Sequence, residues 1–303
     1  MTRILITGGA GMVGRALVAA LGLKDVIATD LSRTGLPADV TFRRMDVTGS
    51  DPDTVIGAER PDVVVHLASI VTPPPGMTRA QAFAVDVTGT RNVVAACVAH
   101  GVKRLVVTSS GAAYGYHPDN PVPLTEDAPC RGNPEFAYAD HKRQVEDILA
   151  EARRDHPELA QVVLRVGTVL GAGTDNQITA LFRRKRLLAI RNSDSPFVFI
   201  WTDDLARIVE RAATAGPAGI YNVAGDGWLS VDDLAQALGK PVLRLPAWVL
   251  KAALAVARPL GLSQYGPEQV RFLQYRPVLD NTRLKNVFGY TPQLTSAQVF
   301  DLW

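Results

Sequence analysis

The length, composition and charge of the chain indicate an ordinary soluble globular protein. It has 303 residues, enough to bury a large core, with 47% hydrophobic and 20% charged residues. The formal net charge is only +2 and is spread along the sequence, so neither nucleic acid nor an anionic membrane is indicated as a partner. Cys97 and Cys130 are the only cysteines, which provides no disulfide framework and no metal-ligand spacing.

Two apolar regions of the sequence indicate where in the cell the protein is expected. A strand predicted at residues 3–7 leaves no room for a signal peptide, so we expect a cytoplasmic protein. The longest apolar region, 248–262, is interrupted by Lys251, Arg258 and Pro259, which excludes a membrane span there. A helix lying on a membrane surface stays an alternative for this region, and packing against the rest of the C-terminal lobe is the favoured interpretation.

The first half of the sequence alternates short apolar strands with helical stretches, the pattern of an α/β protein with a doubly wound parallel sheet. Strands are predicted at 3–7, 25–29, 41–44, 63–67, 104–108 and 161–166, and the clearest helices at 12–21, 80–99 and 139–154. We expect one domain over residues 1–167 and a smaller, mixed α/β substrate lobe over 168–303. A segment near 197–224 is expected to return to the first domain, because 219–223 has the composition of a strand.

A glycine-rich turn joins the first predicted strand to the first helix. It reads Thr7-Gly8-Gly9-Ala10-Gly11-Met12-Val13-Gly14. In this spacing Gly8 permits a tight turn, Gly11 lets backbone N–H groups approach a pyrophosphate, and Gly14 lets the helix pack close to the sheet. The turn predicts a dinucleotide site, with an ordinary structural loop as the alternative.

An acidic residue follows the turn at the distance that a ribose-binding carboxylate requires. Asp30 lies 22 residues after Gly8 and ends the second predicted strand. A carboxylate there accepts both ribose hydroxyls of NAD and repels the 2′-phosphate of NADP. Arg33 is near enough to weaken this preference, so NAD is the predicted cofactor and NADP the less favoured one.

Tyr138 and Lys142 are four residues apart in a predicted helix, so both side chains project from one face. An ammonium beside a phenol favours the phenolate, which gives a general acid/base for neutral pH. Ser110 follows the fifth predicted strand, at the sheet edge where ligands of open α/β sheets bind. We therefore predict a catalytic set of Ser110, Tyr138 and Lys142.

In this order the motifs resemble those of the extended short-chain dehydrogenases/reductases, in the NAD-dependent epimerase/dehydratase family, over essentially the whole chain. The glycine turn matches the family's Thr-Gly-x-x-Gly-x-x-Gly, and Ser109-Ser110-Gly111-Ala112-Ala113-Tyr114-Gly115 matches its serine motif. The resemblance implies a Rossmann-type NAD-binding domain, catalysis by Ser110, Tyr138 and Lys142, and a homodimer built through helices 80–99 and 139–154.

Further segments of the resemblance imply cofactor contacts. Asp46-Val47 resembles the pair that meets the adenine, His66-Leu67-Ala68-Ser69 the segment under the cofactor, and Leu164-Arg165-Val166-Gly167 the strand end on the nicotinamide side. The implied cofactor-binding residues are Gly8, Gly11, Met12, Val13, Gly14, Asp30, Asp46, Val47, Leu67, Ala68, Ser69, Thr108, Tyr138, Lys142 and Val166.

Departures from the family pattern bear on the substrate. Gly111-Ala112 replaces the Asp-Glu pair of the dehydratases, which makes sugar dehydration unfavoured, and Asp86 replaces an asparagine near the active site. In sugar-nucleotide epimerases an asparagine and an arginine contact the diphosphate, with a histidine nearby. This chain has Thr168, Phe197 and Trp201 at these three positions, and with Ser110 they are the candidate substrate residues.

These differences favour a less charged substrate. The opposing observation is a basic group, which could bind a diphosphate, although a solvated helix face is the commoner role of such a run: Arg183, Arg184, Lys185, Arg186 and Arg191. The leading hypothesis is a dehydrogenase or reductase acting on a small molecule. The alternatives are a nucleotide-sugar 4-epimerase that retains NAD and a non-catalytic NAD-binding sensor. No metal site is predicted, because the five histidines are scattered.

Overall fold

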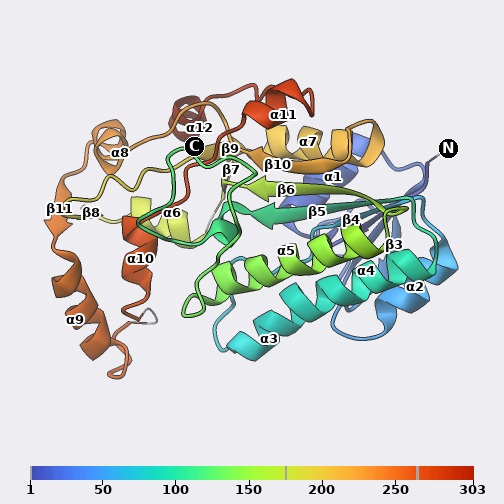
Figure 1. Cartoon of the computed structure of the whole chain (residues 1–303), viewed down its shortest axis with the longest axis horizontal. Coiled ribbons are helices and arrows are strands. Elements are labelled where there is room, and N and C mark those ends of the chain that lie inside the picture. The colour runs from blue at the N-terminus through green and yellow to red at the C-terminus, as the bar shows by residue number, and fades with distance from the viewer. Residues whose placement is uncertain (1, 175, 264–265) are drawn as a thin grey trace.

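The molecule is elongated, with a sheet-containing half at one end and a smaller lobe at the other (Figure 1). The computed structural model describes residues 2–174, 176–263 and 266–303. The strands of the large sheet point their carboxyl ends toward the smaller lobe (Figure 1). Any ligand held at these strand ends therefore lies between the two halves.

Seven parallel strands form the central sheet within the described residues, in the order β10-β6-β5-β4-β1-β2-β3. They are β1 (Ile4–Thr7), β2 (Val26–Asp30), β3 (Thr41–Arg44), β4 (Val63–His66), β5 (Arg104–Ser110), β6 (Ala160–Val166) and β10 (Gly219–Val223). The predicted doubly wound parallel sheet is confirmed. All residues of β1 and β4 are buried, as expected for apolar strands covered on both faces.

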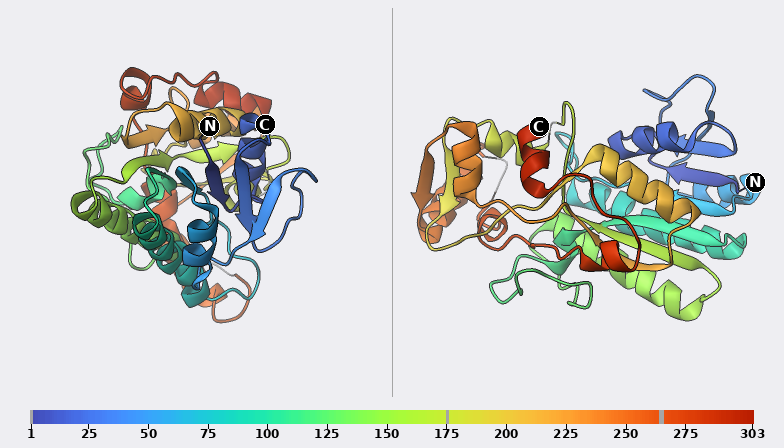
Figure 2. Two further views of the ribbon diagram at one scale, coloured as in Figure 1. Left: turned by 90° about the vertical axis from the view of Figure 1, so that its right-hand side faces the viewer. Right: turned by 90° about the horizontal axis from the view of Figure 1, so that it is seen from above.

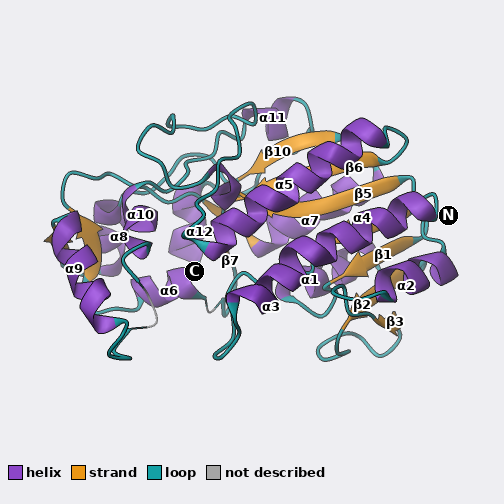
Figure 3. Ribbon diagram, turned by 60° about the horizontal axis from the view of Figure 1, so that its bottom comes forward, coloured by secondary structure: helices purple, strands orange, loops and turns teal. Residues whose placement is uncertain are grey.

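Helices cover both faces of this sheet (Figure 3). The main ones are α1 (Met12–Leu21), α2 (Asp51–Glu59), α4 (Gly89–Ala99), α5 (Ala137–Asp155) and α7 (Thr202–Thr214). On one face α1 and α7 pack through buried side chains such as Leu17 and Ile208. On the other, α2, α4 and α5 contribute a second core that includes Val93 and Leu149. Both faces of the central sheet are therefore covered by helices, so a ligand-binding site is expected at the ends of the strands.

The helix predicted over 80–99 is interrupted. It consists of α3 (Arg79–Phe83), a single π-helical turn η1 (Ala84–Thr88) and then α4. A π turn inserts extra backbone into a helix and changes the direction of the side chains around it. Here it contains Asp86, which is buried. The sequence pattern does not reveal this turn, because its apolar spacing continues on either side.

By length and composition alone, the combined stretch Arg79–Ala99 is the one helix among the described residues that could cross a membrane. Half of its most apolar part is buried inside the fold. Its α4 portion packs on the sheet and on α2, which is the usual environment of an apolar core helix.

The smaller lobe is built on two short parallel strand pairs. The pairs are β7 (Thr168–Leu170) with β9 (Phe199–Trp201), and β8 (Leu187–Ile190) with β11 (Val242–Leu245). The lobe's helices are α6 (Gln177–Phe182), α8 (Val231–Leu238), α9 (Ala247–Ala257), α10 (Gln269–Gln274) and α12 (Ser296–Leu302) (Figure 2). Helix α11 (Thr282–Asn286) packs instead on β10 of the central sheet. An aromatic core that includes Phe182, Phe199 and Phe300 holds the lobe together.

Helix α9 differs from its expected environment. The favoured interpretation of its apolar sequence is packing against the lobe, but no residue of α9 is buried. Leu250 and Leu254 are half-buried on one side of the helix, while Trp248 and Val256 are 72% and 62% exposed. The expectation is therefore wrong for the outer side of the helix. The lobe is too small to cover a helix that is apolar all round.

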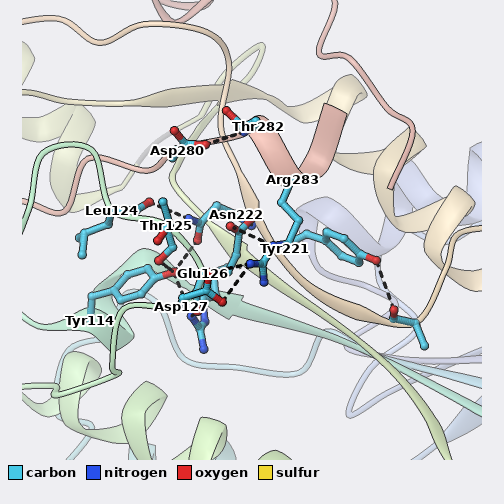
Figure 4. Close-up of polar contacts among 12 residues, drawn as sticks. Tyr114, Leu124, Thr125, Glu126, Asp127, Tyr221, Asn222, Asp280, Thr282 and Arg283 are labelled. Carbon is cyan, nitrogen blue, oxygen red and sulfur yellow. Dashed lines mark hydrogen bonds and ion pairs between the residues drawn. The ribbon is translucent and has the colours of Figure 1, made fainter. Parts of the chain in front are cut away.

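A polar network ties the C-terminal segment back to the sheet (Figure 4). Asn222 of β10 is fully buried, and its side chain accepts a 2.8 Å hydrogen bond from the Tyr114 hydroxyl while donating to the Leu124 carbonyl at 2.9 Å. Arg283 forms a 2.8 Å ion pair with Asp127 at the edge of the same network. These contacts fix the loop that follows the serine motif.

Candidate functional site

The glycine turn after β1 has no space for side chains at two positions. Gly8 has a φ of +69°, and a Cβ there would lie 2.7 Å from the backbone nitrogen of Ala68. A Cβ on Gly14 would lie 2.4 Å from the carbonyl oxygen of Gly8. Helix α1 consequently starts directly beside the sheet, with Gly11 as its N-cap and Met12 and Val13 in its first turn. This is the geometry that brings a helix N-terminus close to a phosphate group.

Asp30 is connected to this turn. One carboxylate oxygen accepts a 3.0 Å hydrogen bond from the Ala10 backbone, and the other accepts one from Leu31 at 2.7 Å. The guanidinium of Arg33 turns away and donates to the carbonyls of Pro37 and Val40, each at 3.0 Å. Its Nη2 is therefore engaged by the loop before β3.

The segment after β4 runs next to the glycine turn. The Thr7 hydroxyl lies 2.7 Å from His66 Nδ1, and the Leu67 backbone donates to the Thr7 carbonyl at 3.1 Å. Burial, and then the charge of Lys142, lower the pKa of His66 to about 3, so its ring is neutral. Ser69 donates a 2.8 Å hydrogen bond to the carboxylate of Asp86. The glycine turn and the segment after β4 are thus joined by hydrogen bonds at the carboxyl ends of the strands.

The remaining residues expected at the cofactor lie along the same edge. Asp46 accepts hydrogen bonds from the backbone and the hydroxyl of Thr48, which lower the pKa of Asp46. Val47 beside it is buried against Gly89. Val166 is the last residue of β6 and is 7% exposed.

The predicted catalytic residues gather at the end of β5. Ser110 is the last residue of the strand, and its Oγ accepts a 3.1 Å hydrogen bond from Ala112 in the 3₁₀ turn η2 (Gly111–Tyr114). Tyr138 is half-buried in the first turn of α5. Lys142 is 4% exposed, its Nζ donates to the Thr108 carbonyl at 3.1 Å, and that Nζ lies 5.8 Å from the centre of the Tyr138 ring.

The residues expected to contact substrate have different environments. Thr168 begins β7 and Trp201 ends β9, and both are half-buried. Phe197 is 4% exposed and stacks on Phe199, with ring centres 5.8 Å apart, so it belongs to the core of the lobe. The basic run 183–186 is exposed in a turn before β8, not on a helix as expected.

Sequence reasoning missed Arg276. Its guanidinium lies 3.7 Å above the centre of the Phe197 ring, and its Nε donates to the Ser195 carbonyl at 3.1 Å. Burial lowers the pKa of Arg276 to about 9, because no carboxylate among the described residues pairs with it. Its Nη1 is buried without a hydrogen-bond partner. The only trace in the sequence is a segment, 269–279, that contains arginine but no acidic residue.

Arg276 also borders the region of Tyr138. The guanidinium is 5.3 Å from the ring of Phe272, which packs edge-on against Tyr116 at 5.4 Å. Tyr116 and Tyr138 belong to one aromatic cluster, together with Phe272. A buried cation with a free donor therefore faces the same cluster that contains the candidate acid/base.

Comparison with known proteins relates this chain to one family and to several relatives. The sequence profile of the NAD-dependent epimerase/dehydratase family matches residues 4–224. An uncharacterized protein of Mycobacterium tuberculosis is 28% identical over 311 residues, covering 98% of this chain and 82% of that protein. A UDP-glucose 4-epimerase of Azospirillum brasilense is 34% identical over 178 residues, covering 56% of this chain and 50% of that protein.

A solved structure shares the fold. The UDP-glucose 4-epimerase of Thermotoga maritima, crystallised with UDP-glucose, has a TM-score of 0.76 and 20% identity, covering 99% of this chain and 96% of that one. The matched profile extends from β1 through the glycine turn and the Tyr138 helix to β10, well over half of the chain. The chain therefore belongs to the NAD-dependent epimerase/dehydratase family and is an NAD-dependent enzyme.

Proposed function

We propose that the chain is an oxidoreductase that transfers hydride between NAD(H) and a hydroxyl- or carbonyl-bearing carbon of a small molecule. The observation that carries this proposal is the position of Lys142 Nζ, which is buried between the Thr108 carbonyl and the Tyr138 ring. A binding protein has no need of a buried ammonium beside a phenol. An enzyme that moves a proton needs both.

The glycine turn fits a dinucleotide. Gly14 lets α1 start directly against the backbone of the turn, because a Cβ there would lie 2.4 Å from the Gly8 carbonyl oxygen, and no side chain among the described residues caps the start of the helix. Asp30, joined to the turn through Ala10, would accept the hydroxyls of the adenosine ribose. When bound, NAD supplies the acceptor or the donor of hydride. Residues 1–167 form the cofactor-binding part of this proposal, and 168–303 the substrate lobe.

Three side chains would perform the proton chemistry. In the oxidative direction the Tyr138 phenolate takes the proton of the substrate hydroxyl while the hydride leaves the same carbon. Lys142, with its Nζ 5.8 Å from the centre of the Tyr138 ring, would place its charge beside the reacting phenol and would also contact the nicotinamide ribose. Ser110 would donate a hydrogen bond to the reacting oxygen, after exchanging its present contact with Ala112. In the reductive direction Tyr138 returns the proton.

A screen of small alcohols and ketones tests this proposal, with the absorbance of the reduced nicotinamide as the readout. We expect substrate-dependent oxidation or reduction of free cofactor by the wild type and its loss in Tyr138→Phe. If no compound changes the cofactor and both proteins bind NAD equally, a non-catalytic NAD-binding role would replace the proposal.

A nucleotide-sugar 4-epimerase is the second candidate, and Arg276 is the observation that favours it. The unpartnered Nη1 of this buried guanidinium suits an anionic group such as a diphosphate. An epimerase oxidises and re-reduces one carbon, so it is expected to retain NAD through purification and to turn over without added cofactor. An enzyme that needs free NAD for turnover would exclude this candidate.

We further propose a cytoplasmic homodimer. Helices α4 and α5 lie side by side on one face of the sheet (Figure 3), where two such pairs from two copies can form a four-helix bundle. Light scattering at micromolar concentration measures the mass directly. A monomer mass that NAD leaves unchanged would contradict the dimer.

A further inference from the structure

Helix α9 lies at the far end of the lobe (Figure 1), and exposed apolar side chains occur in it and in the segments on either side. Five large hydrophobic side chains are at least 40% exposed within twenty residues: Leu243, Trp248, Val256, Leu260 and Leu262. Leu262 reaches 78% exposure and Trp248 72%. We call these five residues the α9 surface. Single exposed apolar residues are normal, but five within twenty residues of sequence are unusual and are typical of an interaction site.

The α9 surface has a distinct charge pattern. From Leu234 to Pro267 the sequence contains no aspartate or glutamate, although it includes four basic residues, Lys240, Arg244, Lys251 and Arg258. Two of these have acidic partners at the borders of the segment: Arg244 pairs with Asp232, and Arg258 lies 3.5 Å from Glu268. Lys251 is exposed in the middle of α9. With both partners counted, the segment 234–267 still has a net positive charge.

Arg191 is another exposed basic residue, and its backbone lies near the start of α9. The Arg191 backbone, at the end of β8, donates a 2.9 Å hydrogen bond to the carbonyl of Leu245, two residues before α9 begins. Apolar side chains, an exposed tryptophan and nearby cations that outnumber the acidic side chains are the combination that an anionic bilayer surface attracts.

The length and the packing of α9 define how it would contact a bilayer. The helix has 11 residues, too few to span the hydrocarbon; it contacts α10, and Leu250 and Leu254 are half-buried. The outer side can therefore enter the headgroup region while the helix stays attached to the lobe. Trp248, with a large ring and an N–H donor, is suited to that region.

A second copy of the chain fits this surface less well. In a two-fold symmetric contact the same patch meets itself, which would place Lys251 and its neighbours opposite like charges. No acidic side chain of the segment would compensate them. An anionic lipid surface supplies the missing negative charge.

We propose that the α9 surface binds the headgroup region of anionic phospholipid bilayers and holds the substrate lobe at the membrane. This is attachment to a membrane surface and involves no membrane span. It goes beyond the reaction and does not depend on which substrate is converted.

Co-sedimentation of the NAD-loaded full chain with vesicles tests the proposal. We expect binding to vesicles of equimolar phosphatidylglycerol and phosphatidylcholine, much weaker binding to phosphatidylcholine alone, and a blue shift of tryptophan fluorescence on binding. Lys251→Gln should weaken the partition about five-fold, the effect of one cation near an anionic surface. Trp248→Glu should weaken it at least about ten-fold, because it places a charge in the apolar contact.

Two matched variants control for general effects. Trp228→Glu changes a tryptophan that is 50% exposed outside the α9 surface, and Lys24→Gln removes an exposed lysine before β2. Both should bind vesicles as the wild type does. Leu262→Glu serves as a second test if Trp248→Glu does not fold, as judged by its thermal melt and NAD affinity.

Three outcomes would overturn the proposal. The first is a wild type that does not bind the anionic vesicles, and the second is an equal loss of binding in Trp228→Glu. The third is a dimer that Trp248→Glu dissociates, which would make the α9 surface a contact between copies.

Discussion

His141 Nδ1 lies 3.0 Å from a carboxylate oxygen of Asp86, and both side chains are only 1% exposed. Asp86 belongs to the π turn η1, while His141 directly precedes Lys142 on α5. Burial raises the pKa of Asp86, but the hydrogen bond from His141, the charge of Lys142 and the bonds from Ile70 and Ser69 together lower it. An ionised carboxylate therefore lies behind the candidate catalytic lysine, and η1 directs it there.

We predict that Asp86→Asn lowers the free energy of unfolding at neutral pH by about 1.5–3 kcal/mol, the usual value of a hydrogen bond to a charged group. A depressed folded-state pKa stabilises the fold above the ordinary carboxyl value and loses this effect as the pH falls through the folded-state value. Below about pH 4 the difference between wild type and variant should therefore shrink. Urea unfolding across this pH range measures it.

Asp53→Asn is the matched control for that experiment. Asp53 also contacts a histidine, His100, at 2.8 Å, but its side chain is 69% exposed. We expect a stability change below about 1 kcal/mol for this exposed pair. If the two substitutions changed the free energy of unfolding equally, burial would not be the reason that the Asp86–His141 contact is strong.

Tyr138→Phe should reduce turnover by about 10²–10⁴-fold, the usual contribution of a general acid–base group, and leave NAD binding nearly intact. Ser110→Ala should reduce turnover less, because it removes one hydrogen bond and leaves the proton path in place. Steady-state kinetics and NAD titration measure both effects. Near-wild-type turnover of Tyr138→Phe would refute the mechanism.

Lys142→Ala should lower both turnover and NAD affinity, since the ammonium is proposed to act on Tyr138 and on the ribose. It also leaves the Thr108 carbonyl without its 3.1 Å partner, so the thermal melt must be recorded alongside. A fall in stability alone, with normal kinetics, would make Lys142 a structural residue.

NAD(H) should bind more tightly than NADP(H), because the Asp30 carboxylate would face the 2′-phosphate. Asp30→Ala should reduce this difference, as measured by fluorescence titration of both cofactors. The turned-away guanidinium of Arg33 supports the preference. Equal affinities of the wild type for the two cofactors would disprove the role of Asp30.

Local sequence patterns were sufficient for the central sheet and for the glycine turn. Val63-Val64-Val65 predicts a strand covered on both faces, and all three side chains are buried in β4. Gly8 and Gly14 predict a turn without space for side chains, which the short Cβ approaches bear out. These features depend on backbone sterics and on burial within one segment, so they are encoded where they occur.

The relationships between distant segments were decided by the tertiary structure. Asp86 meets His141 only because η1 shifts the helix and α5 packs on the same face of the sheet. Arg276 lies over Phe197 only because a segment 79 residues away packs against the aromatic core of the lobe. Helix α9 stays exposed because the side chains of that core are already packed against other elements of the lobe. Side-chain partners of this kind depend on how many faces the assembled layers can bury, a property of the whole fold that no short stretch of sequence contains.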